Sequence, residues 1–313
     1  MDWSGRNPSK KKRSERFENE SIHKRRVIPA QRAYNVPAVN MTHDIPFAEE
    51  PPKRREYSFS VCMLASGSKG NAIFISDGFT SILVDAGLSG IEIERRLRMR
   101  NLSPENLDAI LVSHEHTDHI QGVGVLSRRF DLPVYMSRKT QGAAVSQLKR
   151  IQNLKNFECG SAFRIKTLTI HPFSIAHDAE DPAGFSMECD GAKIGIATDL
   201  GIATSVVKEH LKGSTLLILE ANHDPDMLIE GPYPWPLKQR IKGRTGHLSN
   251  EESKRLLKEV THAGLKHVIL AHLSEKNNTP EKALSEVGQA ITNGTTRLAV
   301  ATQHQCGALL RLK

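Results

Sequence analysis

Four side chains of types that bind metals are concentrated between Leu111 and Ile120, a segment that reads LVSHEHTDHI. The segment overlaps the apolar run from residue 109 to 112, which predicts a buried strand that leads into a polar loop. If strand geometry continued, two imidazoles spaced two residues apart would lie on one side and bind one cation, and the other two side chains could hold a second. A solvated polar loop is the alternative, but four candidate ligands within six residues argue against it: His114, His116, Asp118 and His119.

Candidate ligands also follow three other apolar runs. His177 and Asp178 come after residues 173–176, Asp199 after residues 194–198, and His272 after residues 267–271. A single His or Asp at the end of a strand usually caps it or forms a turn. Because functional residues gather on the loops at one edge of a layered fold, the recurrence of this pattern instead predicts one metal-binding edge.

The composition is that of a folded protein with a basic end. At 313 residues and 38% hydrophobic content, the chain can bury a large core in one or two domains. Residues 1–57 carry 13 basic and 8 acidic side chains, so they contribute +5 to the net charge of +8. They predict a disordered basic N-terminal extension, which either binds a polyanion such as nucleic acid or is simply solvated.

Membrane and secreted classes are excluded by what the sequence lacks. It has no run of 18 or more apolar residues and no apolar secretory signal, so we expect no membrane contact. Cys62, Cys159, Cys189 and Cys306 form no CxxC pair, which indicates a reducing compartment and argues against a disulfide framework or a thiolate zinc site. We therefore predict a cytoplasmic protein.

The elements that must position these ligands alternate along the chain from residue 58 onward. Strands are expected at 58–64, 72–76, 81–84, 109–114, 134–136, 216–220 and 267–271, and helices at 91–99, 123–130, 139–149, 203–211, 250–262 and 280–292. Residues 163–197 are typical of short strands with a hairpin turn at Gly191, and residues 221–248 of a proline-rich loop. Two groups of strands with helices between them predict an α/β fold of two packed sheets flanked by helices, in four layers.

The segment HEHTDH, the later strand-end His, the Asp in TDLG and the His in AHLS resemble the signature of the metallo-β-lactamase superfamily over residues 58–313. More narrowly, SGSKGN, LVDAGLS, HDAEDPAGF, EANHD, GPYPWPLKQRI, GHLSN and HLSEKNN resemble its YycJ/WalJ branch. The resemblance implies a four-layer αββα sandwich and a metal-dependent hydrolase domain at 58–313. It also implies a nuclease, since the branch includes double-stranded DNA exonucleases that act 5′ to 3′.

The resemblance implies a ligand for each position of two metals. It assigns His114, His116 and His177 to the first metal, Asp118, His119 and His272 to the second, and Asp199 to a bridge between them. Such a site could take two zinc or two manganese ions, which acidify a shared water and clamp phosphodiester oxygens. Asp118 could also orient the attacking hydroxide. Asp85 and Asp178 either orient ligand imidazoles or simply form turns.

A leaving oxygen needs a proton, and Glu220 with His247 is the predicted donor pair. Glu220 ends a strand and His247 lies in GHLS, a setting similar to the GH[ST] of ribonuclease Z, where a Glu and a His act together. The match is loose, because Leu248 stands where the relative has its hydroxyl residue. Capping of the helix that follows is the alternative.

The segment from Gly231 to Arg244 predicts a nucleic-acid contact. Basic side chains beside Tyr233 and Trp235 can pair with phosphates and stack on bases, although a solvated loop would look similar: Lys238, Arg240, Lys242 and Arg244. The turn at 66–71 either offers backbone N–H groups to a phosphate or only connects two strands.

Taken together, these residues predict a metal-dependent phosphodiesterase acting on DNA rather than RNA, with no prediction of an oligomeric state. The alternatives are a small-molecule phosphodiesterase, a thioester hydrolase on the same fold, or a binding protein whose site is catalytically inactive.

Overall fold

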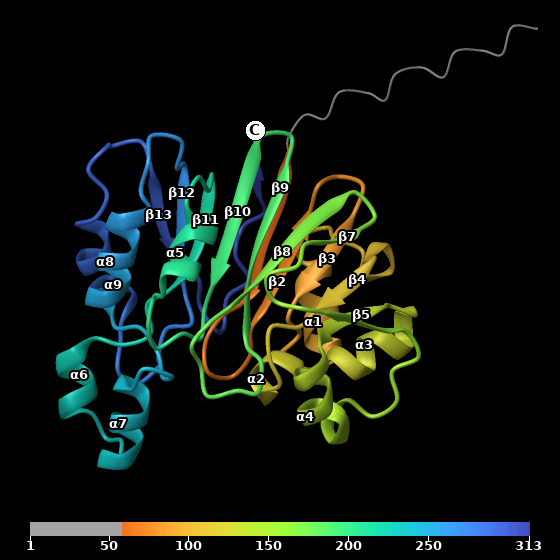
Figure 1. Cartoon of the computed structure of the whole chain (residues 1–313), viewed down its shortest axis with the longest axis horizontal. Helices are drawn as coiled ribbons and strands as arrows, with labels where there is room; N and C mark the ends of the chain where they lie inside the picture. Colours follow the sequence, from red (N-terminus) through yellow and green to blue (C-terminus); the bar gives the residue numbers. More distant parts are fainter. Residues whose placement is uncertain (1–57) are drawn as a thin grey trace, which may run out of the picture. The chain divides into compact units, whose positions relative to one another are not determined.

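Two seven-stranded sheets form the centre of the protein in a computed structural model that describes residues 58–313 (Figure 1). The predicted basic extension, residues 1–57, lies outside the described residues. In spatial order, sheet A contains β14 (Leu310–Leu312), β1 (Phe59–Ala65), β2 (Ala72–Ser76), β3 (Ser81–Val84), β4 (Ala109–Leu111), β5 (Val134–Ser137) and β6 (Leu154–Phe157). Sheet B contains β13 (Arg297–Val300), β12 (His267–Ala271), β11 (Leu216–Glu220), β10 (Ala192–Ala197), β9 (Ala183–Cys189), β8 (Leu168–Ser174) and β7 (Phe163–Ile165).

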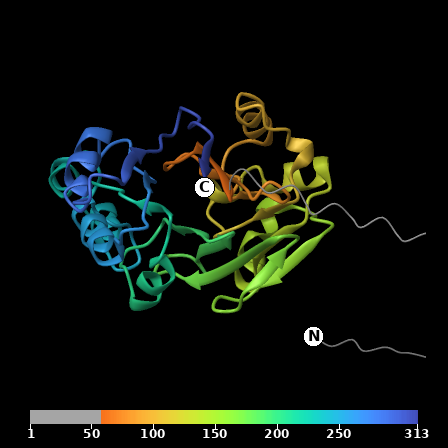
Figure 2. The ribbon, with the colours of Figure 1, turned by 90° about the horizontal axis from the view of Figure 1, so that it is seen from above.

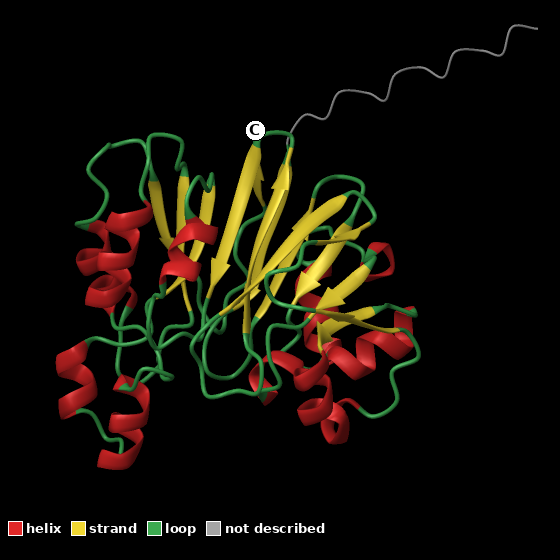
Figure 3. Cartoon of the chain, viewed as in Figure 1, coloured by secondary structure: helices red, strands yellow, loops and turns green. Residues whose placement is uncertain are grey.

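Helices cover the outer face of each sheet (Figures 2 and 3). Those beside sheet A are α1 (Gly90–Arg98), the 3-10 turn η1 (Pro104–Asn106), α2 (Thr117–Ile120), α3 (Val123–Phe130) and α4 (Arg138–Leu148). Those beside sheet B are α5 (Ser205–Leu211), α8 (Asn250–Val260) and α9 (Pro280–Gly288), while α6 (Pro225–Glu230) and α7 (Trp235–Lys242) lie beyond its lower edge in Figure 1. None of the helices within residues 58–313 is long and apolar enough to cross a membrane.

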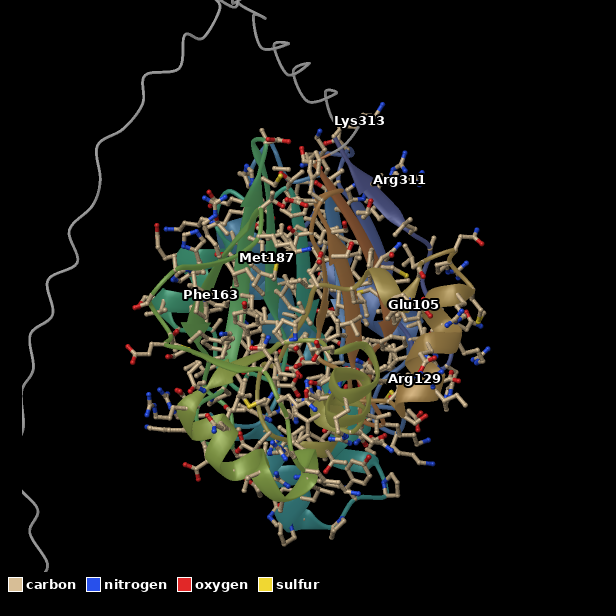
Figure 4. All side chains as sticks on the ribbon, turned by 90° about the vertical axis from the view of Figure 1, so that its right-hand side faces the viewer. Glu105, Arg129, Phe163, Met187, Arg311 and Lys313 are labelled. Atoms are coloured by element: carbon tan, nitrogen blue, oxygen red, sulfur yellow. The ribbon has the colours of Figure 1, made fainter. Side chains whose placement is uncertain are left out.

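Alternation along the strands produces the four layers. In β1, Phe59, Val61 and Met63 point into the core between the sheets, whereas Cys62 and Leu64 pack against the helices outside sheet A. In β11, Leu216 and Ile218 point inward, and Leu217 and Leu219 pack against the helices outside sheet B. Both faces of each sheet are therefore buried, and the predicted four-layer α/β fold is confirmed. Seen from the side, the strands with Phe163 and Met187 lie across from the layer with Glu105 and Arg129 (Figure 4).

Parallel strands bring the candidate ligands to one edge. Strands β3 to β6 run parallel to one another in sheet A, and β10 to β13 do so in sheet B. Because the carboxyl ends of parallel strands share an edge, the loops after β3, β4, β10, β11 and β12 meet there. These loops, together with the loop after β8 that carries His177, form the predicted site.

Two predictions about local structure are wrong. The proline-rich stretch 221–248 contains helices α6 and α7, because Pro225 and Pro236 stand in the first turn of each, where proline needs no hydrogen-bond partner for its missing N–H. The strand before the HEHTDH segment ends at Leu111, so strand geometry does not continue to His116.

Candidate metal and catalytic site

Three residues of the site end their strands in a left-handed backbone conformation. Asp85 after β3, Asp199 after β10 and His272 after β12 have φ angles of 60°, 59° and 55°. Few residues other than glycine adopt this region, and each instance costs on the order of 1 kcal/mol or more. Contacts hold it in place: the N–H of Asp85 donates to Leu111 O at 2.8 Å, and that of His272 donates to Ser66 Oγ at 2.7 Å.

The first predicted ligand set converges on one point. Nε2 of His114 lies 3.1 Å from Nδ1 of His116, and Nε2 of His177 lies 3.2 Å from the same atom. Tetrahedral zinc with bonds of about 2.0–2.1 Å holds two nitrogens about 3.3 Å apart, so these three imidazoles fit one ion. The loop after β4 brings His114 and His116 together, and His116 has an extended backbone just before α2.

The second predicted set lies beside the first. Oδ2 of Asp118 is 3.6 Å from Nε2 of both His119 and His272. Helix α2 presents Asp118 and His119, and the end of β12 presents His272. Mixed nitrogen and oxygen ligands of this kind suit zinc or manganese.

Asp199 connects the two sets. Its Oδ2 lies 3.4 Å from Nε2 of His119, and Asp199, His119 and His114 have donor atoms within 4.8 Å of one another. Oδ2 of Asp199 and Nε2 of His272 are buried and make no hydrogen bond, which is costly unless a bound ion satisfies them. The residues therefore fit a divalent metal, and the structure brings all seven predicted ligands together.

Asp85 orients His119 from behind. Nδ1 of His119 donates to Oδ2 of Asp85 at 2.8 Å, which leaves Nε2 for a metal. The same carboxylate accepts the N–H and the hydroxyl of Ser113, each at 2.8 Å. Burial disfavours the charged form of His119, but Asp199, Asp85 and Asp118 outweigh it and raise the pKa of His119 well above its usual value.

His177 is oriented by a backbone carbonyl, not by Asp178. Its Nδ1 donates to Gly246 O at 3.3 Å, while Oδ1 of Asp178 lies 3.3 Å from Nε2, the nitrogen that faces the other imidazoles. The second oxygen of Asp178 accepts from Arg240. The predicted orienting role of Asp178 is therefore corrected, since the carboxylate lies on the ligand side of the ring. Burial lowers the pKa of His177, which favours the neutral form that binds metals.

Glu220 holds two imidazoles and is itself inaccessible. Its Oε1 accepts from Nδ1 of His247 at 2.8 Å and from Nδ1 of His272 at 2.9 Å, while Oε2 accepts the N–H groups of Leu200 and Leu248. Burial would raise the pKa of Glu220, but His247 and His272 lower it to about 2. An ionised, fully buried carboxylate cannot donate a proton. Glu220 as a donor is therefore corrected: its carboxylate positions the ring of His247, and His247 alone remains the predicted donor.

Asn71 was missed by sequence reasoning. Its Nδ2 lies 3.3 Å from Oδ2 of Asp118 and 3.1 Å from Nε2 of His119, and its N–H donates to Asp118 O at 2.8 Å. In the turn 66–71, the N–H groups of Gly67, Lys69 and Gly70 also donate within the protein. The turn therefore fixes the second ligand set, and these groups are not available to a phosphate.

Helix α7 separates the four predicted nucleic-acid contacts. Arg240 lines the cavity over the ligands, whereas Lys242 and Arg244 are exposed and do not line it. Lys238 is 8% exposed and its ammonium donates to Ile229 O at the end of α6, so its predicted contact with nucleic acid is corrected. In a helix, residues two positions apart point about 200° away from each other, which a loop interpretation could not foresee.

The cavity over the ligands has a volume of about 220 Å³. Its lining includes the candidate ligands Asp118, His177, Asp199 and His272 together with Tyr233, Leu237, Arg240 and Ile241 from α7 and the turn before it. His247 also lines it, with 21% of its side chain exposed.

Known proteins match both the sequence and this architecture. Residues 80–273 match the family model described as "Beta-lactamase superfamily domain". The exodeoxyribonuclease YycJ of Bacillus anthracis is 37% identical over 235 residues, which cover 74% of this chain and 88% of that protein. The exodeoxyribonuclease WalJ of Streptococcus pneumoniae is 37% identical over 232 residues, which cover 73% and 86%.

The chain belongs to the β-lactamase superfamily, in the family of YycJ and WalJ. The predicted resemblance is thereby confirmed. The metallo-β-lactamase fold protein YhfI of Bacillus subtilis has the same fold, with a TM-score of 0.63 at 19% identity over 79% of this chain and 98% of that one. As expected for this superfamily, the His and Asp clusters lie where a divalent metal could bind.

Proposed function

We propose that the chain is a metal-dependent exodeoxyribonuclease that hydrolyses phosphodiester bonds of double-stranded DNA from the 5′ end. The observation that carries the proposal is the juxtaposition of two ligand sets, joined by Asp199, with His247 at the same cavity. Relatives named exodeoxyribonucleases cover most of the chain and support DNA rather than RNA as substrate. Residues 58–313 would form the hydrolase domain, with residues 1–57 as an extension of it. All four cysteines are free thiols, as suits a cytoplasmic enzyme.

The ligand sets would hold two divalent ions. His114, His116 and His177 would take one and Asp118, His119 and His272 the other, with Asp199 shared, and zinc and manganese both suit such donors. When bound, two ions supply an acidified water and a clamp for phosphoryl oxygens.

The protein's own groups complete the reaction. His247 would give a proton to the departing oxygen, because its Nδ1 is engaged by Glu220 and its ring faces the cavity. Glu220 would keep the ring oriented, because its Oε1 accepts from Nδ1 of His247. Asp118, held by Asn71, would accept a hydrogen bond from the attacking water and align it with the phosphorus.

A substrate panel tests the proposal. The full-length protein, loaded with zinc or manganese, should release labelled mononucleotides from the 5′ end of linear duplex DNA and leave a covalently closed circular duplex intact. Single strands, RNA of the same sequence, and duplexes with a 5′-phosphate or a 5′-hydroxyl define the preference. His114→Ala, which removes one ligand, should be inactive throughout.

A small-molecule hydrolase is the alternative on this fold. Cleavage of a cyclic nucleotide or a thioester, with linear duplex DNA untouched under both metals, would replace the nuclease proposal with that one.

A further inference from the structure

Arg240 is the one arginine or lysine among the described residues that line the cavity. It projects from the side of α7 that also carries Leu237 and Ile241. Arg240 and Ile241 come three and four residues after Leu237, a spacing that places them on the same helical face as Leu237. Its neighbours on that face are apolar, and 62% of its side chain is exposed. The cation thus lines the same cavity as the candidate metal ligands, and most of its side chain remains exposed.

Asp178 links this cation to the ligands. One carboxylate oxygen accepts from Nε of Arg240, and the other lies 3.3 Å from Nε2 of His177. The guanidinium is therefore held within the span of a single carboxylate from the first ligand set. Since Asp178 engages Nε, the two Nη groups remain suited to the paired oxygens of another anion.

A phosphate is an anion whose paired oxygens match the two Nη groups of the guanidinium. In a polynucleotide, each scissile phosphate is followed by another about one nucleotide away, whereas a small phosphodiester has none. A guanidinium beyond the ligands would meet the second phosphate and not the one being cleaved. Asp178, which neutralises Arg240 in the free protein, would then be exchanged for that phosphate.

We propose that Arg240 binds the phosphate next to the scissile one, with Asp178 holding the guanidinium in place until the substrate arrives. The inference rests on the proposed function, because it names the part of the site that distinguishes a polynucleotide from a small phosphodiester. Arg240 is in this sense a specificity-determining residue.

Arg98 offers a matched control on another helix. It is an arginine at the end of α1 that pairs with Glu105 at 2.9 Å, its side chain is 57% exposed, and it does not line the cavity. An ion pair as exposed as that of Arg240 with Asp178 adds little to stability, so Arg240→Ala is expected to fold. Melting temperature and metal content should match those of the wild type in both variants.

The experiment compares two substrates. Arg240→Ala should lower kcat/KM on linear duplex DNA about tenfold to a hundredfold through a higher KM, as expected for the loss of a charge-assisted contact. Its kcat/KM on bis(p-nitrophenyl) phosphate, which has a single phosphate, should stay within about twofold of wild type. Arg240→Lys should recover part of the loss, and Arg98→Ala should match wild type on both substrates.

Two outcomes overturn the inference while the nuclease proposal stands: equal losses on both substrates, or an Arg240→Ala protein that cleaves DNA as well as Arg98→Ala does. Failure of the proposed function is separate, because it appears in the wild type as an absence of DNA cleavage.

Discussion

The two ligand sets lie side by side but are backed by different groups. In the first, Nδ1 of His114 contacts the Ser113 hydroxyl at 2.9 Å and Nδ1 of His177 contacts the Gly246 carbonyl at 3.3 Å, both uncharged. In the second, Nδ1 of His119 meets Asp85 and Nδ1 of His272 meets Glu220, both carboxylates.

The pKa values of the imidazoles are shifted in opposite directions in the two sets. Burial and the neighbouring imidazole of His119 lower the pKa of His114 well below its usual value, and burial lowers that of His177. Burial acts the same way on His272, but Asp199, Asp118 and Glu220 outweigh it and raise its pKa to about 10. Near neutral pH, His114 and His177 are therefore neutral in the metal-free protein, whereas His119 and His272 are protonated and must release protons to bind an ion.

Asp199→Ala should have the largest effect, because this residue belongs to both sets. It removes the shared carboxylate, and we expect hydrolysis of duplex DNA to fall by about a thousandfold or more, beyond the 10²–10³ typical of one lost electrostatic contact. Metal content, measured by elemental analysis, should fall for both ions. Asp199→Asn, which tolerates the left-handed backbone, controls for misfolding. One full equivalent of metal left in either set would show that the sets are independent.

His247→Ala should lower kcat about 10²–10⁴-fold without emptying either set, since the loss is that of a proton donor. Glu220→Gln should lower kcat similarly and also weaken metal binding in the second set, because Glu220 holds both His247 and His272. Kinetics and metal stoichiometry together separate the two. Loss of metal from His247→Ala would instead make this residue a ligand, as its proximity to Asp199 and His272 permits.

Asp85→Asn should act on one set only. Loss of the carboxylate behind His119 is expected to weaken metal affinity there by about 10- to 100-fold and to leave the first set unchanged, as measured by chelator competition. Asp108→Asn is the matched control, because Asp108 is a carboxylate of the same sheet that pairs with Ser81 N–H and Lys166, away from the ligands. Equal weakening of both sets by Asp85→Asn would contradict the division.

The smallest effect concerns protons. A raised pKa means that His272 binds a proton at pH 7 in the metal-free protein, so filling the second set should release more protons than filling the first. Titration calorimetry in buffers of different ionisation enthalpy measures this number. Equal release from both sets would remove the electrostatic distinction.

The raised pKa of His272 also makes the stability of the metal-free protein depend on pH. His272 contributes stability that is fully present below about pH 6.5, the unfolded value, and is lost as the pH rises toward 10. His177, whose pKa is lowered, contributes in the opposite sense and costs stability as the pH falls below about 6.5. Melting temperatures across this range test both signs.

The candidate ligands could be predicted from the sequence because each one follows an apolar run. The predicted bounds are correct for strands β2, β3, β11 and β12 and for helix α3. The residues that follow these strands could therefore be assigned to one edge of the fold from the sequence. By contrast, Asn71 and the Gly246 carbonyl act through contacts between distant segments, and no residue type at those positions signals a role. The periodicity of α7 was hidden by its prolines, which explains why Lys238 was placed on the surface.

The left-handed backbone at Asp85, Asp199 and His272 decides whether the site could be transferred to another protein. A graft of HEHTDH onto another protein would transfer four of the seven candidate ligands and leave behind Asp199, His177 and His272. Two of those three stand on backbone that a short peptide would relax, because only β10 and β12, anchored in sheet B and tied to sheet A by contacts such as His272 N–H to Ser66, keep them in that conformation. Transfer of this site to another protein therefore requires the strand ends of both sheets, since the motif by itself would supply an incomplete set of candidate ligands.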